Sequence, residues 1–521
     1  MPSPIGSRDR GRAIPIRFRR WLPFLLAALA AIAIRLPLLG VPLDADEGGY
    51  AYLSRRWAAG SQLYGAAWVD RPQALLVSYR LVTGLGRSRV WIHLAAIGLA
   101  VLLLFAVASA AWAVAGRRAA ILGAALVAVV GAAPHLQGFM FNGELAAGAF
   151  SAWAVAGAAW YVRSRAGWLL VLAGACGAIA VLMKQSGFDG LALALICAYA
   201  IGRFRAVGAV LLGAAGPLGL ALLQAALTSW RNWWFAVVGY RLQTSAGSRG
   251  GLAGRWHNLT AGVPHLWPDL LPLAALGLAG LALCLARPGW RASRRLLPRW
   301  LRPGWLVVGW LAAHLLTPRW LRPTWLAPRW LAPAWLTLAF AGFFGGVFFF
   351  PHYWMQLVGP LCLLGALALA AVPVRPAICL LLLACLPCLL WTVQAGTASP
   401  DRRDRLAVPD PRLLANRTIA GWLRAHAAPG DQLYAFVSSA DLYYSTGLHT
   451  DFRYLWQANL EAIPATVGQL RSYLAGPDQP QWVVVYQQPA AIDPSGALGR
   501  TLAGDYWQVT VIDGYRILHR R

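Results

Sequence analysis

Residues 43–72 read LDADEGGYAYLSRRWAAGSQLYGAAWVDRP, and they follow directly on an apolar segment. The whole chain has 19 acidic residues against 46 basic ones, yet Asp44, Asp46 and Glu47 fall between positions 44 and 47. Three carboxylates at the end of an apolar segment are either simply solvated there or do chemistry at that boundary. The rest of the sequence decides between these interpretations.

The composition predicts a polytopic α-helical membrane protein. Charged residues make up 12% of the chain, about half the share of a typical soluble domain. Apolar runs of about 20 residues recur through roughly the first 400 positions, long enough to cross a bilayer core of about 30 Å. The net charge of +27 does not indicate nucleic-acid binding, because the arginines lie between the apolar runs. Positive-inside loops and anionic lipid headgroups account for them, so we expect membrane lipids as partners and no nucleic acid.

The cysteines do not indicate a disulfide framework or a redox centre. All seven lie in apolar runs, and residues 400–521 contain none. The CLPC motif at 385–388 matches C-x-x-C, but inside a membrane run it is more typical of small apolar packing. Lys184 is the only lysine in the chain, which makes its retention noteworthy.

The arginine distribution predicts the topology. We expect residues 1–20 to be a basic cytoplasmic N-terminus, followed by a transmembrane domain over 21–396. A cleaved signal peptide is the alternative for the first apolar run. About eleven crossings are expected, the fourth ending at Tyr161 and the sixth just before Arg203. The others lie at about 21–40, 90–112, 119–133, 167–183, 206–227, 266–286, 335–350, 355–372 and 377–395.

An odd number of crossings places residues 400–521 outside the cell membrane. They predict a small α/β domain with strands at 431–438, 481–488 and 506–513 and helices at 411–427 and 463–475. Residues 298–336 contain an imperfect Pro-Arg-Trp-Leu repeat, in which the frequent prolines exclude a regular helix. We interpret the repeat as an insertion; a membrane-inserted segment within it would change the helix count.

This topology gathers polar residues at one face of the membrane. A transporter would more often place ionisable groups near the bilayer midplane. A boundary position suits a reaction between a lipid-borne substrate and a partner in the exported space. The simpler alternative is that the acids are solvated and that the cations extend to lipid headgroups. The grouped residues are Asp44, Asp46, Glu47, Asp70, Arg71, Asn142, Glu144, Lys184, Gln185, His352 and Tyr353.

The first outer loop, residues 41–89, resembles that of the integral-membrane, type C glycosyltransferases that use polyprenyl-phosphate sugars. Bacterial relatives of protein O-mannosyltransferases, aminoarabinose transferases and galacturonosyltransferases belong to this class. Looser matches are FNGE (141–144), MKQSG (183–187) and FFFPHYWMQLVGP (348–360), so the resemblance covers most of residues 20–400. The residues in the pattern's places in the first loop are Asp44, Asp46, Glu47, Tyr50, Gly60, Tyr64, Asp70, Arg71 and Pro72.

Two features depart from the family pattern. The family's Lys-Pro-Pro element is Arg71-Pro72-Gln73 here. Arginine still supplies a cation and binds phosphate through two parallel hydrogen bonds, so the role survives. The Pro-Arg-Trp-Leu repeat has no counterpart in the family, which puts the helix count in doubt but leaves the first loop unaffected.

The resemblance implies a bacterial inner-membrane glycosyltransferase with a polyprenyl-phosphate sugar donor and an envelope glycan, lipid or protein acceptor. Transfer on the extracytoplasmic face would be inverting, with Asp46 as general base and Glu47 or Asp44 orienting it. Arg71 would clamp the phosphate, with Lys184 as a second candidate. The pocket would be lined by Tyr50, Tyr64, Asp70, Asn142, Glu144, Gln185, His352 and Tyr353.

The sequence leaves two alternatives, one for metal binding and one for function. Paired carboxylates bind hard cations, so a divalent metal at Asp44 and Asp46 is an alternative, although the sequence shows no further fixed ligands. A transporter or flippase of lipid-linked saccharides is the rival function, and a non-catalytic membrane scaffold is a third. We also expect the segment after Tyr50 to form a surface helix that lies flat on the membrane, since Tyr52, Leu53 and Trp57 are apolar while Ser54, Arg55 and Arg56 are polar.

Overall fold

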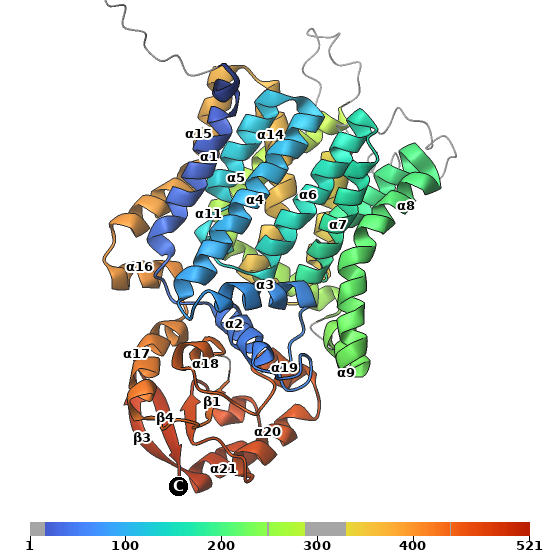
Figure 1. The fold of residues 1–521 in the computed structure, drawn as a ribbon. Helices are drawn as coiled ribbons and strands as arrows, with labels where there is room; N and C mark the ends of the chain where they lie inside the picture. The colour runs from blue at the N-terminus through green and yellow to red at the C-terminus, as the bar shows by residue number, and fades with distance from the viewer. Residues whose placement is uncertain (1–15, 247–249, 287–329, 438) are drawn as a thin grey trace, which may run out of the picture.

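The computed structural model describes residues 16–246, 250–286, 330–437 and 439–521. A bundle of long helices forms one part of the molecule, and a smaller part with a β-sheet sits at one end of it (Figure 1). The bundle consists of α1 (Ile16–Arg35), α4 (Arg89–Ala115), α5 (Arg117–Val130), α6 (Gly143–Ser164), α7 (Trp168–Met183), α8 (Asp189–Thr228), α11 (Leu252–Leu285), α13 (Leu331–Phe344), α14 (Met355–Ala371) and α15 (Val374–Thr397).

The bundle agrees closely with the predicted apolar segments. Seven of the described helices are long and apolar enough to cross a membrane, and α7 and α13 are shorter apolar helices. Arg203 has a non-helical backbone within α8 (φ 55°, ψ −148°). It separates the two consecutive segments that the sequence predicts there. The total of eleven crossings stays a prediction, and most of the repeat at 298–336 lies outside the described residues.

Short elements connect the bundle helices at the end that faces the smaller part. The expected surface stretch 228–265 is almost wholly helical where it is described, because α11 begins at Leu252 rather than near 266. The connecting elements are η1 (Leu36–Leu38), α2 (Ala45–Ala58), α3 (Gln73–Gly84), η2 (Pro134–Leu136), α9 (Trp230–Trp234), η3 (Phe235–Gly239), α10 (Tyr240–Ala246), η8 (Pro351–Trp354) and α16 (Pro400–Ala407).

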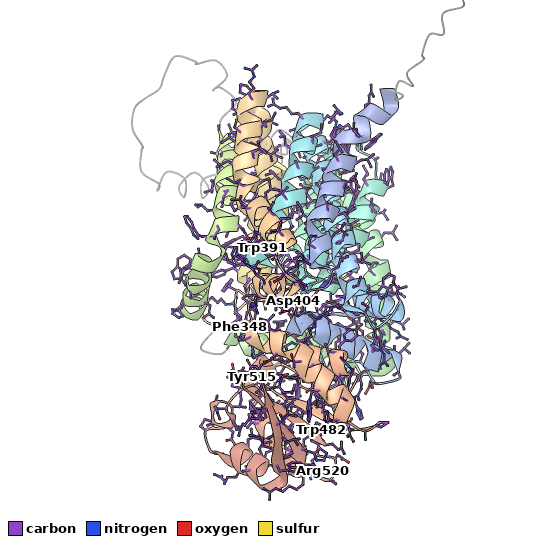
Figure 2. All side chains as sticks on the ribbon, turned by 90° about the vertical axis from the view of Figure 1, so that its left-hand side faces the viewer. Phe348, Trp391, Asp404, Trp482, Tyr515 and Arg520 are labelled. Carbon is purple, nitrogen blue, oxygen red and sulfur yellow. The ribbon has the colours of Figure 1, made fainter. Side chains whose placement is uncertain are left out.

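The C-terminal part is the expected α/β domain, with one strand more than predicted. Its four-stranded sheet has the order β1-β2-β4-β3, in which β1 and β2 are parallel and the other pairs antiparallel. Figure 2 shows Asp404 of α16 at the boundary, with Trp482 and Arg520 farther from the bundle. The domain contains α17 (Pro411–His426), β1 (Leu433–Phe436), α18 (Asp441–Thr446), α19 (Gln457–Ala462), α20 (Thr466–Ala475), β2 (Trp482–Val485), η9 (Pro489–Ala491), α21 (Ala497–Asp505), β3 (Tyr506–Ile512) and β4 (Tyr515–Arg520).

The segment after Tyr50 is helical as predicted, but its surroundings differ from the prediction. It belongs to α2, which lies between the bundle and the C-terminal domain and packs against α3 and α18 (Figure 1). Tyr52 stacks on Tyr443 of α18, with ring centroids 5.1 Å apart. A Cβ atom at Gly48 would collide with Asp441, so α2 and α18 can approach this closely only because position 48 is glycine. The C-terminal domain, rather than lipid, therefore covers this face of α2.

Candidate functional site

Asp44 and Glu47 fix the start of α2. Asp44 is the N-cap residue, and its carboxylate accepts a hydrogen bond from the Asp46 N–H at 3.4 Å. Glu47 accepts one from the Asp44 N–H at 3.1 Å, which completes a capping box. The other Glu47 oxygen accepts from the Phe141 N–H at 2.7 Å, and His93 Nε2 lies 3.6 Å from Glu47 Oε2. Both carboxylates thus have structural tasks.

The surroundings of Asp44 also affect its ionisation. Burial, and the negative charges of Asp46 and Glu47, raise the pKa of Asp44 to about 8. The proton that Asp44 retains at neutral pH relieves repulsion among three carboxyl groups in one helical turn. A capping carboxyl group that already carries a proton is poorly placed to accept one from an incoming substrate.

Asp46 is half-buried and, unlike Asp44 and Glu47, does not cap the start of α2. Its side chain is 21% exposed, against 1% for Glu47. Oδ2 accepts a hydrogen bond from the Tyr50 hydroxyl at 3.0 Å, and Arg71 Nη2 lies 3.9 Å from the same atom. Among the described residues, none donates a hydrogen bond to Oδ1. Of the three clustered acids, Asp46 is the one whose side chain takes no part in the capping box.

Arg71 links Asp46 to a second acid and a second cation. Arg71 Nη1 donates to Asp70 Oδ2 at 2.9 Å, and Arg241 of α10 forms an ion pair with the same oxygen. Burial alone would raise the pKa of Asp70, but Arg241 and Arg71 lower it below its ordinary value. We call Asp46, Asp70, Arg71 and Arg241 the arginine cluster; its formal charges balance.

Neighbouring side chains hold the arginine cluster in place. The Tyr64 hydroxyl donates to the Arg71 carbonyl oxygen at 3.0 Å, and Gln185 Nε2 donates to the Asp70 carbonyl oxygen at 2.8 Å. Tyr50 and Tyr64 are almost fully buried, at 2% and 1% exposure. They therefore act as supports of the cluster. Arg71 Nε is buried and has no hydrogen-bond partner in the described part of the chain, which leaves one N–H available.

Glu144, Lys184 and His352 form a second group, the lysine cluster. Lys184 forms an ion pair with Glu144 of α6, and His352 Nε2 lies 3.8 Å from the same carboxylate oxygen. The ammonium group of Lys184 lies 3.6 Å from the centre of the Tyr353 ring. Burial lowers the pKa of Lys184 to about 8, although the Glu144 charge opposes this. The structure thus brings together four residues that the sequence placed in three separate loops.

A cavity of about 230 Å³ adjoins both clusters. Lys184 and Arg241 supply cations to its wall, Tyr353 and Gln356 supply polar groups, and Phe188 and Phe343 supply apolar surface. We call it the cation cavity. Two cations beside aromatic surface suit a ligand with an anionic head and an apolar tail.

Asn142 does not take part in either cluster. It is the N-cap residue of α6, where its Oδ1 accepts from the Leu145 N–H at 2.7 Å. Its Nδ2 donates to the Gln137 carbonyl oxygen at 3.4 Å. The structure therefore gives Asn142 a capping role next to Glu144, and its contact with substrate stays a prediction.

Sequence reasoning missed three residues that complete the site. Arg241 neutralises Asp70, Gln137 Oε1 lies 2.9 Å from His352 Nδ1, and His93 lies against Glu47. Arg241 lies in the aromatic stretch 230–241, where an arginine beside Tyr240 was the available signal. For Gln137 the signal was weaker: it lies in a short outer loop, in a left-handed conformation (φ 52°).

The paired acids do not form a ready-made metal site. The Asp44 carboxylate caps α2, and Asp46 shares one oxygen with Tyr50 and Arg71. In the described part of the chain, no three His, Cys, Asp or Glu side chains are grouped as metal ligands. The divalent metal at Asp44 and Asp46 stays a prediction, and loss of activity on treatment with a chelator would support it.

Comparisons with known proteins establish the fold. The chain is similar to ArnT from Cupriavidus metallidurans bound to undecaprenyl phosphate, with a TM-score of 0.61 and 18% identity over 96% of this chain and 97% of that one. ArnT in the apo state gives 0.64 and 16% over 96% and 98%. The Archaeoglobus fulgidus oligosaccharyltransferase in complex with Zn and sulfate gives 0.52 and 14% over 89% and 67%. No family model matches the chain, and neither does any curated protein sequence.

Proposed function

We propose that this chain, an integral membrane protein with the ArnT-like type C glycosyltransferase fold, transfers a sugar from a polyprenyl-phosphate donor to a cell-envelope acceptor. One observation carries the proposal: the partly exposed Asp46 carboxylate lies 3.9 Å from the buried Arg71 guanidinium. A proton acceptor and a phosphate-binding cation are thus adjacent. The ArnT structure bound to undecaprenyl phosphate supports a lipid phosphate as the donor's carrier.

The proposed reaction needs one base and one cation. Asp46 takes the proton of the acceptor hydroxyl group while the oxygen of that hydroxyl group attacks C1 of the sugar. The acceptor oxygen attacks from the face of C1 opposite the phosphate, and the bond between C1 and the phosphate oxygen breaks with its electrons remaining on the phosphate. The configuration at C1 therefore inverts in a single step. The lipid phosphate leaves with an additional negative charge, which nearby cations stabilise.

The positions of the cations suit the stabilisation of the leaving lipid phosphate. The Arg71 guanidinium lies beside the base and keeps its Nε–H unpaired. Arg241 and Lys184 line the cation cavity, and Arg71 is connected to Arg241 through Asp70. We propose that the phosphate of the donor enters the cation cavity and binds these groups, with the polyprenyl chain leaving along apolar surface.

The orientation in the membrane is part of the proposal. The arginine cluster, the lysine cluster and the C-terminal domain occupy the same end of the bundle (Figure 1). Other arginines lie at the opposite end of the bundle. There Arg117 donates a hydrogen bond to the carbonyl oxygen of Arg20 at 3.1 Å, and Arg118 donates one to the carbonyl oxygen of Val372 at 2.5 Å. By the positive-inside rule the arginine-rich end faces the cytoplasm, so the site faces the exported space of the bacterial inner membrane.

An assay of donor consumption tests the function directly. Full-length protein in nanodiscs would be incubated with a polyprenyl-phosphate-linked sugar and an envelope extract, and lipids would be analysed by mass spectrometry. A glycosyltransferase converts the donor into free polyprenyl phosphate. The rival function, a flippase, would leave the donor chemically intact. Unchanged donor with every sugar tried would contradict the proposal, and a donor that accumulates in cells lacking the protein would identify the sugar.

A further inference from the structure

A second polar cavity lies where the bundle meets the C-terminal domain. Its volume is about 410 Å³, and it shares no lining residue with the cation cavity. Arg87 and Arg89, at the end of the first loop, line it from the bundle side. Arg417 and Arg424 of α17 line it from the C-terminal domain. We call it the junction cavity.

The positive charge of the junction cavity is only partly balanced. Arg417 lies 3.6 Å from Asp404, and Arg424 donates to the Ser445 carbonyl oxygen at 2.6 Å. Arg87 and Arg89 have no hydrogen bond or ion pair within the described ranges. Four like charges around one space repel one another, and an anion between them removes that repulsion.

A buried carboxyl group with an unused oxygen lines the same cavity. Asp441 is 3% exposed, and its Oδ2 accepts from Asn416 Nδ2 at 2.8 Å. Its Oδ1 has no hydrogen-bond partner in the described structure. Buried polar atoms are normally paired, so an unpaired one beside a cavity points to a missing ligand or water. Burial raises the pKa of Asp441 to about 7, and its protonated form can donate a hydrogen bond to an anion.

The junction cavity is close to the proposed base. Asp441 packs against Gly48 of α2, and Leu43 lines the cavity immediately before the capping box. Asp46 lies in the first turn of the same helix, where it contacts Tyr50 and Arg71. The junction cavity and the proposed base are thus connected through the first turn of α2.

We propose that the junction cavity binds an anionic group, a phosphate or carboxylate, on the acceptor side of α2. The four arginines supply the charge and hydrogen bonds that such a group needs. This inference rests on the proposed function, because the proposed function is what places an acceptor next to α2. Two sources share this chemistry: an acidic group on the acceptor itself and the headgroup of a bilayer phospholipid.

Binding of radiolabelled inorganic pyrophosphate to the full-length protein in phosphatidylcholine nanodiscs tests the site. The double variant Arg417→Gln/Arg424→Gln should weaken one binding site by about 10-fold or more, the effect of losing a charge-assisted contact. The exposed Arg87 side chain makes no hydrogen bond or ion pair in the described structure, so Arg87→Gln breaks none. This variant should also weaken pyrophosphate binding at the same site. Arg471→Gln, an exposed arginine of α20 outside the cavity, is the matched control and should bind as the wild type does.

Two further arms separate the alternatives. Arg241→Gln alters the cation cavity and the arginine cluster but no residue that lines the junction cavity, so it should retain the pyrophosphate site that the junction variants lose. Adding phosphatidylglycerol to the nanodiscs should displace pyrophosphate if the source is a lipid headgroup and should not if the source is a free acidic acceptor. Wild-type affinity in both junction variants would overturn the inference. This result would not bear on donor consumption, so a failure here and a failure of the proposed function are distinguishable.

Discussion

The arginine cluster and the lysine cluster lie at the same end of the bundle and differ mainly in access to solvent. Each balances its acids against lysine or arginine. Asp46 and Arg241 of the arginine cluster keep 21% and 30% of their side chains exposed. Glu144 and Lys184 keep 2% and 9%. The partly exposed Asp46 can therefore meet an incoming hydroxyl group, whereas the buried Glu144 can only hold Lys184 in place at the wall of the cation cavity.

The largest effect is expected from breaking the buried pair. Glu144→Gln removes the counter-ion of Lys184, and an uncompensated buried charge destabilises a protein by about 3–5 kcal/mol. Thermal unfolding of the detergent-solubilised protein, followed by tryptophan fluorescence, measures the loss. The double variant Glu144→Gln/Lys184→Gln should lose less than the single one. Equal or greater loss in the double variant would show that the pair does not act as a buried framework.

A smaller effect is expected for the cations that face substrate. Losing one charge-assisted contact to a phosphate costs about 1.5–3 kcal/mol, or roughly 10–150-fold in affinity. Arg71→Ala and Arg241→Ala should each weaken donor binding by that order, while Arg71→Lys keeps part of it. Titration with undecaprenyl phosphate measures the change, with Arg471→Ala as the control. Wild-type affinity in both alanine variants would remove the phosphate role from the arginine cluster.

The smallest effect is expected for the capping acid beside the base. Asparagine caps a helix as well as aspartate does, whereas Asp44→Ala should cost about 0.5–2 kcal/mol of stability. The pKa of Asp44 is raised to about 8 in the folded protein, from about 4 when unfolded. Wild-type stability should therefore fall as the pH rises from about 4 through 8, because the folded state holds the proton more tightly.

Asp44→Asn should flatten this dependence, because asparagine does not ionise. Unfolding temperatures of both proteins at pH 5 and pH 8 measure it, and the difference between the two pH values should be smaller in the variant. The same slope in both proteins would mean that another group carries the titration.

Much of the fold could be predicted from the sequence because apolar length and helix periodicity are local properties. The kink at Arg203 fell where a charged residue interrupts an apolar run, and the helices on either side match the predicted segments. The strand β4 was missed, although Asp513 and Gly514 precede it. Both have positive φ, at 51° and 85°, and this dipeptide is a strong local signal for a tight hairpin.

The candidate site could be predicted only in part, because its partners are distant in sequence. The sequence identified Asp46, Asp70 and Arg71, which share one loop. Arg241 completes the arginine cluster from 171 positions beyond Asp70, a contact that only the packing of α10 produces. The sequence also did not predict the separate roles of Asp44, Asp46 and Glu47, because these roles depend on the residue at which α2 begins. A capping box takes two of the three acids and leaves the third accessible.

The central claim is that Asp46 is the general base, and sugar transfer by the purified Asp46→Asn variant tests it most directly. Asparagine keeps the shape of the side chain but cannot accept the proton, and general-base assistance typically contributes about 10²–10⁴-fold. Turnover should fall by that order while undecaprenyl-phosphate binding and unfolding temperature change little, and Asp44→Asn should retain most of the activity. Transfer at the wild-type rate by Asp46→Asn would contradict the account.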